Sequence, residues 1–157
     1  GGGTGTWRWD VEAGVLNELQ AGSYLFMDSH YGRIGGEKGP VYDDFEPSLF
    51  VLTTVVSTPT NDRVIVDAGQ KALASDSGLA PCIELEGAEH VKASDEHGVL
   101  QLSSVARRPE LGETLLFQPS HCDPTINLYD AYYGIRGGME EGALETIIPV
   151  AARGCVW

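Results

Sequence analysis

Short runs of apolar and β-branched residues recur along this chain, and they predict β-strands. One of them, residues 82–86, alternates apolar and acidic side chains, which is typical of a half-exposed strand. The predicted strands are residues 24–27, 50–56, 63–67, 82–86, 99–102 and 114–117. Near the end, residues 131–136 and 144–150 flank Gly137-Gly138, and this pattern predicts a β-hairpin.

Helical patterns are weaker than the strand patterns. Residues 10–20 predict a short helix with Asp10 as its N-cap, because Val11, Val15, Leu16 and Leu19 fall on one stripe. Residues 70–75 predict a single helical turn. The 20 glycines and 8 prolines interrupt the remaining sequence often. We therefore expect a mainly β fold, an antiparallel β-sandwich or barrel.

Composition narrows the function classes. The formal net charge is −13, so we expect no nucleic-acid partner, because phosphate binding needs clustered Lys and Arg. No apolar run reaches the about 18 residues of a membrane span, so we expect no membrane partner. The 3 cysteines are too few and odd in number for a disulfide framework. With no secretion signal visible, we expect a cytoplasmic protein.

The chain opens on GGGTGT, residues 1–6, without a methionine, and this start suggests a fragment of a longer protein. Glycine N–H groups can surround an anion, and the threonine hydroxyls add donors, so this stretch could bind a phosphate. A glycine-rich terminus is more often a flexible tail or a cloning scar. Composition alone leaves both interpretations open.

The stretch PSHCDP, residues 119–124, is the strongest candidate for metal chemistry. In an extended segment His121 and Asp123 would point to one side and Cys122 to the other. An imidazole and a carboxylate suit Zn²⁺ or Mn²⁺, and two protein ligands leave positions for water and substrate. The alternatives are a His hydrogen-bonded to an Asp near a turn, or a Cys122 nucleophile beside His121.

Two other polar stretches carry weaker hypotheses. Residues 95–98 place two acids beside His97, and a polar turn between strands explains them best. Lys71 is one of only three lysines. A lysine that forms a Schiff base needs a dry pocket, so we expect Lys71 to be an ordinary surface or ion-paired residue.

Taken together, several stretches of this chain resemble the D-threonine aldolase and D-serine dehydratase family, pyridoxal-phosphate enzymes of the alanine racemase-like fold. They occur in the family's order and extend over nearly the whole chain. They are GGGTGT at 1–6, ELQAGSYLFMD at 18–28, VDAGQKALASDSG at 66–78, DEHGVL at 95–100, PSHCDPTINLYD at 119–130 and VAARG at 150–154.

The resemblance implies that residues 1–35 are the last strands of an α/β (TIM-type) barrel and residues 36–157 a C-terminal β domain. It implies pyridoxal 5'-phosphate and a divalent metal (Mn, Mg, Co or Zn) as cofactors, with His121 and Asp123 as the metal ligands. The implied cofactor-binding residues are Gly3, Thr4, Gly5, Gly22, Ser23 and Tyr24.

The residue at position 123 separates the branches of the family. Dehydratases resemble H-x-C here and aldolases H-x-D, so Asp123 indicates a lyase that cleaves D-3-hydroxy amino acids to glycine and an aldehyde. No segment matches the family's Schiff-base lysine, so we expect no activity from this chain alone, and we assign no catalytic residue. The alternatives are a D-serine dehydratase-like enzyme and a non-catalytic β module for folding or interaction. The resemblance also implies a homodimer of the full-length protein.

Overall fold

The computed structural model describes residues 1–103, 107–138 and 141–155. A five-stranded sheet has the strand order β3-β4-β2-β1-β5, and a separate hairpin pairs β6 with β7. The strands are β1 Val51–Thr60, β2 Arg63–Val66, β3 Ala88–Ala93, β4 Gly98–Leu102, β5 Thr114–Phe117, β6 Ala131–Arg136 and β7 Ala143–Pro149. The helices are α1 Trp7–Ala13, the 3₁₀ helix η1 Ser23–Leu25, α2 Ser29–Gly32 and α3 Cys122–Ile126.

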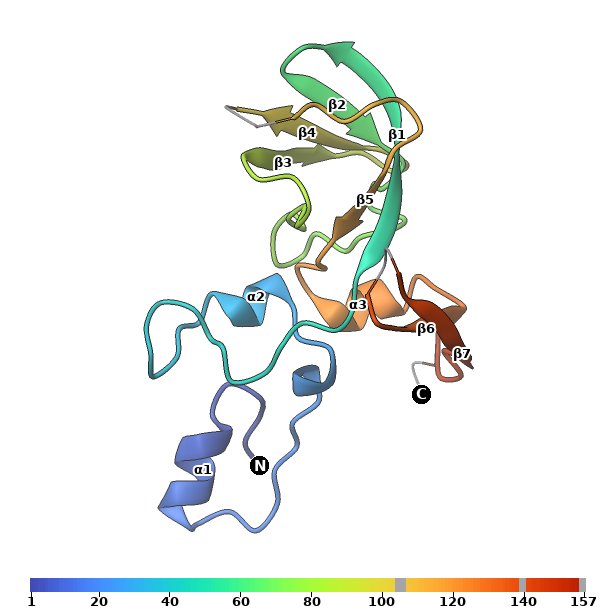
Figure 1. The fold of residues 1–157 in the computed structure, drawn as a ribbon. Coiled ribbons are helices and arrows are strands. Elements are labelled where there is room, and N and C mark those ends of the chain that lie inside the picture. The colour runs from blue at the N-terminus through green and yellow to red at the C-terminus, as the bar shows by residue number, and fades with distance from the viewer. Residues whose placement is uncertain (104–106, 139–140, 156–157) are drawn as a thin grey trace.

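Every strand pair is antiparallel, and the five-stranded sheet is curled (Figure 1). Strands β2 and β4 alternate fully buried with more exposed positions, so one face of the sheet packs against the core. The loop between β2 and β3 covers that face with Ala68, Leu73, Ala80, Cys82 and Leu85. The core also contains residues from β1, β2, β4 and β5. The predicted mainly β, antiparallel fold is therefore confirmed.

Most predicted strands are found where the pattern placed them. Residues 50–56, 63–67, 99–102 and 114–117 correspond to β1, β2, β4 and β5, and the predicted hairpin corresponds to β6 and β7. Gly137 and Gly138 have φ values of 91° and 87°, the left-handed conformation that glycine favours in a reversal. Strand β3 was not predicted, because AEHVKA has no strong β-branched signal.

Two predicted strands are wrong. Residues 24–27 overlap the 3₁₀ helix η1, because a short apolar run does not distinguish strand from helix. In residues 82–86 only Cys82 forms a bridge, with Phe117. The backbone pairing ends there because the Glu84 carboxylate, and not a backbone carbonyl, accepts the Leu116 N–H at 2.7 Å.

The predicted helix over residues 10–20 is also shifted. Helix α1 begins after Thr6 and ends at Gly14, whose φ of 62° gives the left-handed C-cap that commonly stops a helix. Asp10 therefore lies inside the helix, where its carboxylate accepts from the Thr6 hydroxyl at 2.7 Å. The predicted single turn near residue 70 is present, since the Leu73 N–H donates to the Gly69 carbonyl at 3.0 Å.

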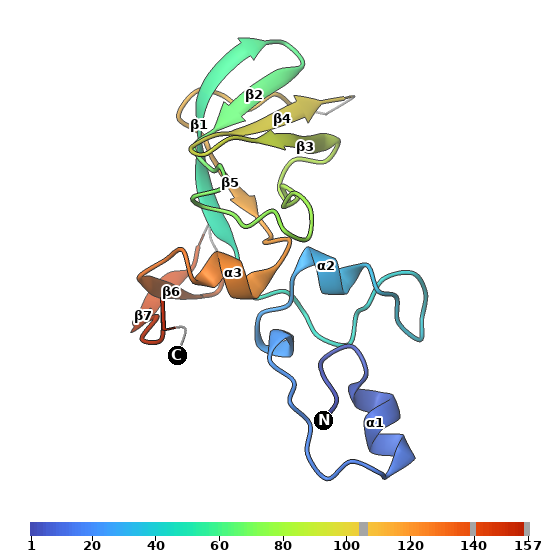
Figure 2. The same ribbon diagram turned by 180° about the vertical axis from the view of Figure 1, so that it is seen from behind.

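The first 35 residues lie beside one end of the curled sheet, and both views show α2 near α3 (Figures 1 and 2). The N–H groups of Ser29 and His30 donate to the carbonyls of Pro119 and Ser120, at 3.0 and 3.1 Å. This pairing connects the N-terminal segment to the loop that precedes α3. Among the helices that the structure describes, none is long and apolar enough to cross a membrane.

Candidate metal and cofactor site

The candidate metal pair lies at the start of α3. His121 is extended, with φ −144° and ψ 120°, but Asp123 is already in the first helical turn, so the expected extended segment ends at His121. Pro124 fits this turn because proline has no N–H group, and the first N–H groups of a helix have no intrahelical partner to lose. The pair still comes together: His121 Nε2 lies 3.6 Å from Asp123 Oδ2.

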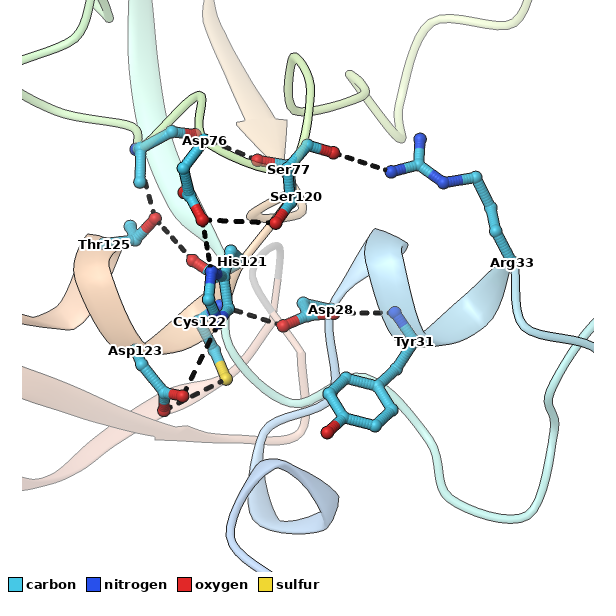
Figure 3. A network of polar contacts seen from close by, with 11 residues as sticks. Asp28, Tyr31, Arg33, Asp76, Ser77, Ser120, His121, Cys122, Asp123 and Thr125 are labelled. Atoms are coloured by element: carbon cyan, nitrogen blue, oxygen red, sulfur yellow. Dashed lines mark hydrogen bonds and ion pairs between the residues drawn. The ribbon is translucent and has the colours of Figure 1, made fainter. Parts of the chain in front are cut away.

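A third residue, Asp76, contacts this pair, and no local sequence pattern predicted it. Asp76 Oδ2 lies 2.6 Å from His121 Nδ1 (Figure 3). Burial would lower the pKa of His121, but the hydrogen bond and charge of Asp76, with the charges of Asp123 and Asp28, raise it overall. The hydrogen bond from His121 in turn lowers the pKa of Asp76. Asp76 lies in the stretch 66–78 that resembles the family. It is 45 residues from His121 in sequence, so no local pattern predicts their contact.

Cys122 is fully buried, and its Sγ lies 3.7 Å from Asp123 Oδ1. Burial, followed by the negative charges of Asp123 and Asp28, raises the pKa of its thiol to about 12. A thiol with so high a pKa is protonated at neutral pH and is therefore a poor nucleophile. The hypothesis of a Cys122 nucleophile is therefore unsupported. The side chain of Cys122 is buried, and its backbone N–H donates to Asp28.

Asp28 is a fully buried carboxylate that connects two helices. Its Oδ1 accepts the Tyr31 N–H of α2 and its Oδ2 accepts the Cys122 N–H of α3, both at 2.9 Å. The same junction brings the His30 ring to 6.5 Å from the His121 ring, measured between centroids. The end of the N-terminal segment is thus attached directly to the loop that carries the candidate metal pair.

The two stretches predicted to bind the cofactor also meet. The Thr4 hydroxyl accepts the Tyr24 N–H at 3.0 Å, and the Thr4 carbonyl accepts from the Tyr42 hydroxyl at 2.5 Å. Thr4 and Ser23 are buried, whereas Tyr24 is exposed. At Gly3 and Gly22 an added Cβ would meet nothing within 4 Å, so the backbone there is open to approach. Gly5 differs, since Ile34 lies against it.

The weaker candidates have ordinary surroundings. Residues 95–97 lie in the turn between β3 and β4, as expected, and Gly98 begins β4. Lys71 forms an exposed ion pair with Glu96, and Lys38 forms one with Asp43. Within the described part of the chain, no group of three or more His, Cys, Asp and Glu side chains is arranged to hold a metal. His121 and Asp123 therefore form a two-ligand candidate.

The curled sheet and the α3 loop together match a known class of domain. Residues 48–135 match the family described as "Putative serine dehydratase domain", and the chain belongs to this family. The matched region contains the whole five-stranded sheet, Asp76 and the candidate metal pair.

Among individual relatives, the chain is 45% identical over 154 residues to a D-threonine aldolase from Arthrobacter sp.. It is 42% identical over 156 residues to a 3-hydroxy-D-aspartate aldolase from Paracoccus denitrificans. Each alignment covers 98% of this chain but only 39% of the relative, so the chain spans about two-fifths of their length.

Solved structures agree with this relationship. The D-threonine aldolase from Filomicrobium marinum superposes with a TM-score of 0.91 at 43% identity, covering 100% of this chain and 42% of that one. A metal-free variant of a D-threo-3-hydroxyaspartate dehydratase matches with a TM-score of 0.65 at 25% identity, covering 86% and 39%. The fold is therefore shared by aldolases and dehydratases.

Proposed function

We propose that this chain carries the metal pair and part of the cofactor-binding segments of a lyase that depends on pyridoxal 5'-phosphate and a divalent metal. The proposed substrates are D-3-hydroxy amino acids, cleaved to glycine and an aldehyde. The observation that carries the proposal is the 3.6 Å separation of His121 Nε2 and Asp123 Oδ2. The aldolase names of the two relatives above support this reaction.

The donor pair suits a divalent metal. Two ligands bound at about 2.1 Å lie roughly 3.0 Å apart in octahedral and 3.4 Å apart in tetrahedral geometry. The observed 3.6 Å needs only a small side-chain adjustment to fit either. The Asp123 side chain is 73% exposed, which leaves room for water and substrate. A carboxylate beside an imidazole favours Mn²⁺, Mg²⁺ or Co²⁺, and also accommodates Zn²⁺.

The residues of the first segment suit the phosphate end of the cofactor. We propose that Gly3, Thr4 and Gly5, together with Gly22, Ser23 and Tyr24, bind that phosphate through backbone N–H groups and hydroxyls. The open backbone at Gly3 and Gly22 supports this role. Lys38, Lys71 and Lys92 are all exposed, so we propose that a lysine outside this chain holds the aldehyde end.

When bound, the cofactor would supply the electron sink for Cα–Cβ cleavage, and the metal would supply the positive charge that acidifies the β-hydroxyl. His121 and Asp123 would hold the ion and so orient the hydroxyl. Cys122 is fully buried, whereas the Asp123 side chain is 73% exposed, so Asp123 is the ligand that an ion from solvent would reach. We expect the 157-residue chain to have no lyase activity by itself.

We further propose that residues 1–35 belong to the cofactor-binding barrel and residues 36–157 to the C-terminal β domain. Two observations support this division: Gly2 and Leu19 form a parallel bridge, and the family match begins at residue 48. We propose a cytoplasmic homodimer for the full-length protein. The exposed apolar side chains of β7 support self-association.

A dehydratase is the second candidate, favoured by the name of the matched family and by the similar dehydratase structure. The two reactions differ in their products. An aldolase converts D-threonine to glycine and acetaldehyde, whereas a dehydratase releases ammonia and a keto acid. Asp123 favours the aldolase, because the aldolase branch of the family has the pattern H-x-D at this position and the dehydratase branch has H-x-C.

The test measures both product pairs, and bound metal by mass spectrometry, in the full-length protein supplied with pyridoxal phosphate and Mn²⁺. His121→Ala and Asp123→Ala should each lose the metal and at least about 100-fold of the activity, because each removes a ligand. Asp95→Ala and His97→Ala are matched controls, with the same residue types at the same spacing in the exposed β3–β4 turn. Ammonia and keto acid would favour the dehydratase, and metal retained by both ligand variants would refute the assigned pair.

A further inference from the structure

We infer that Asp76 is a positioning residue for the metal pair: its carboxylate orients the His121 ring so that Nε2 faces Asp123. This inference rests on the proposed function, because it concerns the same site. The contact that carries it is the 2.6 Å hydrogen bond between His121 Nδ1 and Asp76 Oδ2. On the other side of the ring, His121 Nε2 lies 3.6 Å from Asp123 Oδ2.

The chemistry of the contact determines which ring nitrogen is available. An ionised carboxylate only accepts hydrogen bonds, so Nδ1 has to carry the proton. In the neutral imidazole the lone pair is then on Nε2, the nitrogen that faces Asp123. A carboxylate behind a metal-binding histidine also makes the ring a stronger electron donor. Asp76 therefore selects the tautomer that can bind a metal beside Asp123.

Asp76 is itself held by its neighbour Ser77, which Arg33 contacts in turn. The Ser77 hydroxyl donates to the same Asp76 Oδ2 at 3.2 Å. Arg33, just after α2, donates from Nη2 to the Ser77 carbonyl at 2.9 Å (Figure 3). The carboxylate is about half exposed, and these contacts restrict the rotamers that it would otherwise sample.

The backbone that leads to Asp76 is also connected to the metal loop. The Ala74 carbonyl accepts the Ser120 hydroxyl at 2.9 Å, and the Ala74 N–H donates to the Thr125 hydroxyl at 3.2 Å. The Thr125 hydroxyl in turn donates to the His121 carbonyl at 2.8 Å. Ser120 and Thr125 are buried, so these bonds are shielded from water. Segments about 45 residues apart in sequence are therefore fixed as one unit.

A simple surface ion pair is the competing explanation, and it makes a different prediction. Exposed pairs contribute little and act through charge alone. A positioning carboxylate acts through the hydrogen-bond acceptor at Nδ1. Asp76→Asn separates the two, since it removes the charge but keeps an amide oxygen that can accept from Nδ1–H. Asp76→Ala removes both.

The first experiment measures Mn²⁺ affinity by calorimetry on the full-length protein. Asp76→Ala should weaken binding about 10- to 100-fold, the usual effect of removing a carboxylate behind a metal-binding histidine. Asp76→Asn should recover part of that loss. Asp95→Ala is the control, because it removes the same charge from the exposed β3–β4 turn, and it should bind like wild type. Equal affinity in wild type and Asp76→Ala would overturn the inference.

The second experiment reads the tautomer directly, by ¹⁵N NMR of the His121 ring in metal-free protein at a pH where the ring is neutral. Wild type should show the proton on Nδ1, and Asp76→Ala should show a shift toward the Nε2–H form. A merely structural role would leave this ratio unchanged, so an unchanged ratio would also overturn the inference. If wild type binds no Mn²⁺, the proposed metal site fails, and the tautomer still decides the role of Asp76.

Discussion

The five-stranded sheet and the loop around α3 are stabilised in different ways. The sheet is built on apolar contacts: Leu100, Leu115 and Phe117 are fully buried, and the loop between β2 and β3 packs over them. The α3 loop depends instead on polar contacts to distant segments. Asp28 and Asp76 bind it from positions 94 and 45 residues away in sequence.

This difference separates stability from chemistry. Burial of apolar area is non-directional and tolerates small shifts, so it can hold a sheet without fixing any one side chain. A hydrogen bond requires both a short distance and a direction, so the α3 loop gains a defined geometry for His121. We therefore expect changes in the sheet to alter global stability, and changes in the polar contacts to alter the site.

The largest effect should come from the sheet. Phe117→Ala should lower the free energy of unfolding by about 3–5 kcal/mol, because it leaves a cavity in a closely packed core. Phe117 is 0% exposed, and its ring lies 5.5 Å from the His90 ring, so little can move to fill the space. Urea denaturation followed by circular dichroism measures this loss.

Leu52→Ala is the matched control for that experiment. Leu52 lies on β1, opposite Leu116 of β5, but its side chain is 54% exposed. A substitution there should change the free energy of unfolding by about 0.5 kcal/mol. If the two variants lost equal stability, the sheet would not depend on its buried face. The contrast between an apolar sheet and a polar α3 loop would then be wrong.

The same contrast explains how much could be predicted from sequence. The strands β1, β2, β4 and β5 follow from local runs of apolar and β-branched residues, because strand propensity depends on neighbouring residues. The alternating residues 82–86, by contrast, contribute only one bridge. The proximity of His121 and Asp123 was predicted for the wrong reason, as an extended segment. Asp76 and Asp28 could not be predicted as partners of the loop, since no local pattern records which distant carboxylate will reach it.

The second-largest effect should come from a substitution that disrupts only the polar contacts of the α3 loop. Asp28→Asn should destabilise the contact between α2 and α3 by about 1–3 kcal/mol. The amide has only one acceptor oxygen for two N–H groups, those of Tyr31 and Cys122. The loss should be local. Hydrogen exchange should speed up in α2 and α3, while the amides of the sheet keep their protection.

Asp43→Asn makes the same chemical change in an exposed ion pair with Lys38, and hydrogen exchange there should match wild type. A global loss of protection in Asp28→Asn would mean that the sheet and the α3 loop unfold as one unit. The distinction between a stability region and a site region would then not apply to this chain.

The smallest effect concerns a polar group inside the apolar region. His90 is buried, its Nδ1 donates to the Ala80 carbonyl at 3.0 Å, and its Nε2 has no partner among the described residues. Burial lowers the pKa of His90 below its usual value. The unfolded chain therefore takes up a proton at a pH where the folded chain does not, and stability falls as the pH decreases below about 6.5.

Because only one proton is taken up, the free energy of unfolding can change by at most about 1.4 kcal/mol per pH unit through His90. His90→Leu removes the titration, so the stability of that variant should fall less than that of wild type between pH 7 and pH 5. His97→Leu, in the exposed β3–β4 turn, should keep the wild-type slope. His121 acts in the opposite direction, because its raised pKa adds stability at low pH that is lost as the pH rises. Identical slopes in wild type and His90→Leu would show that the apolar core accepts the charged ring without penalty.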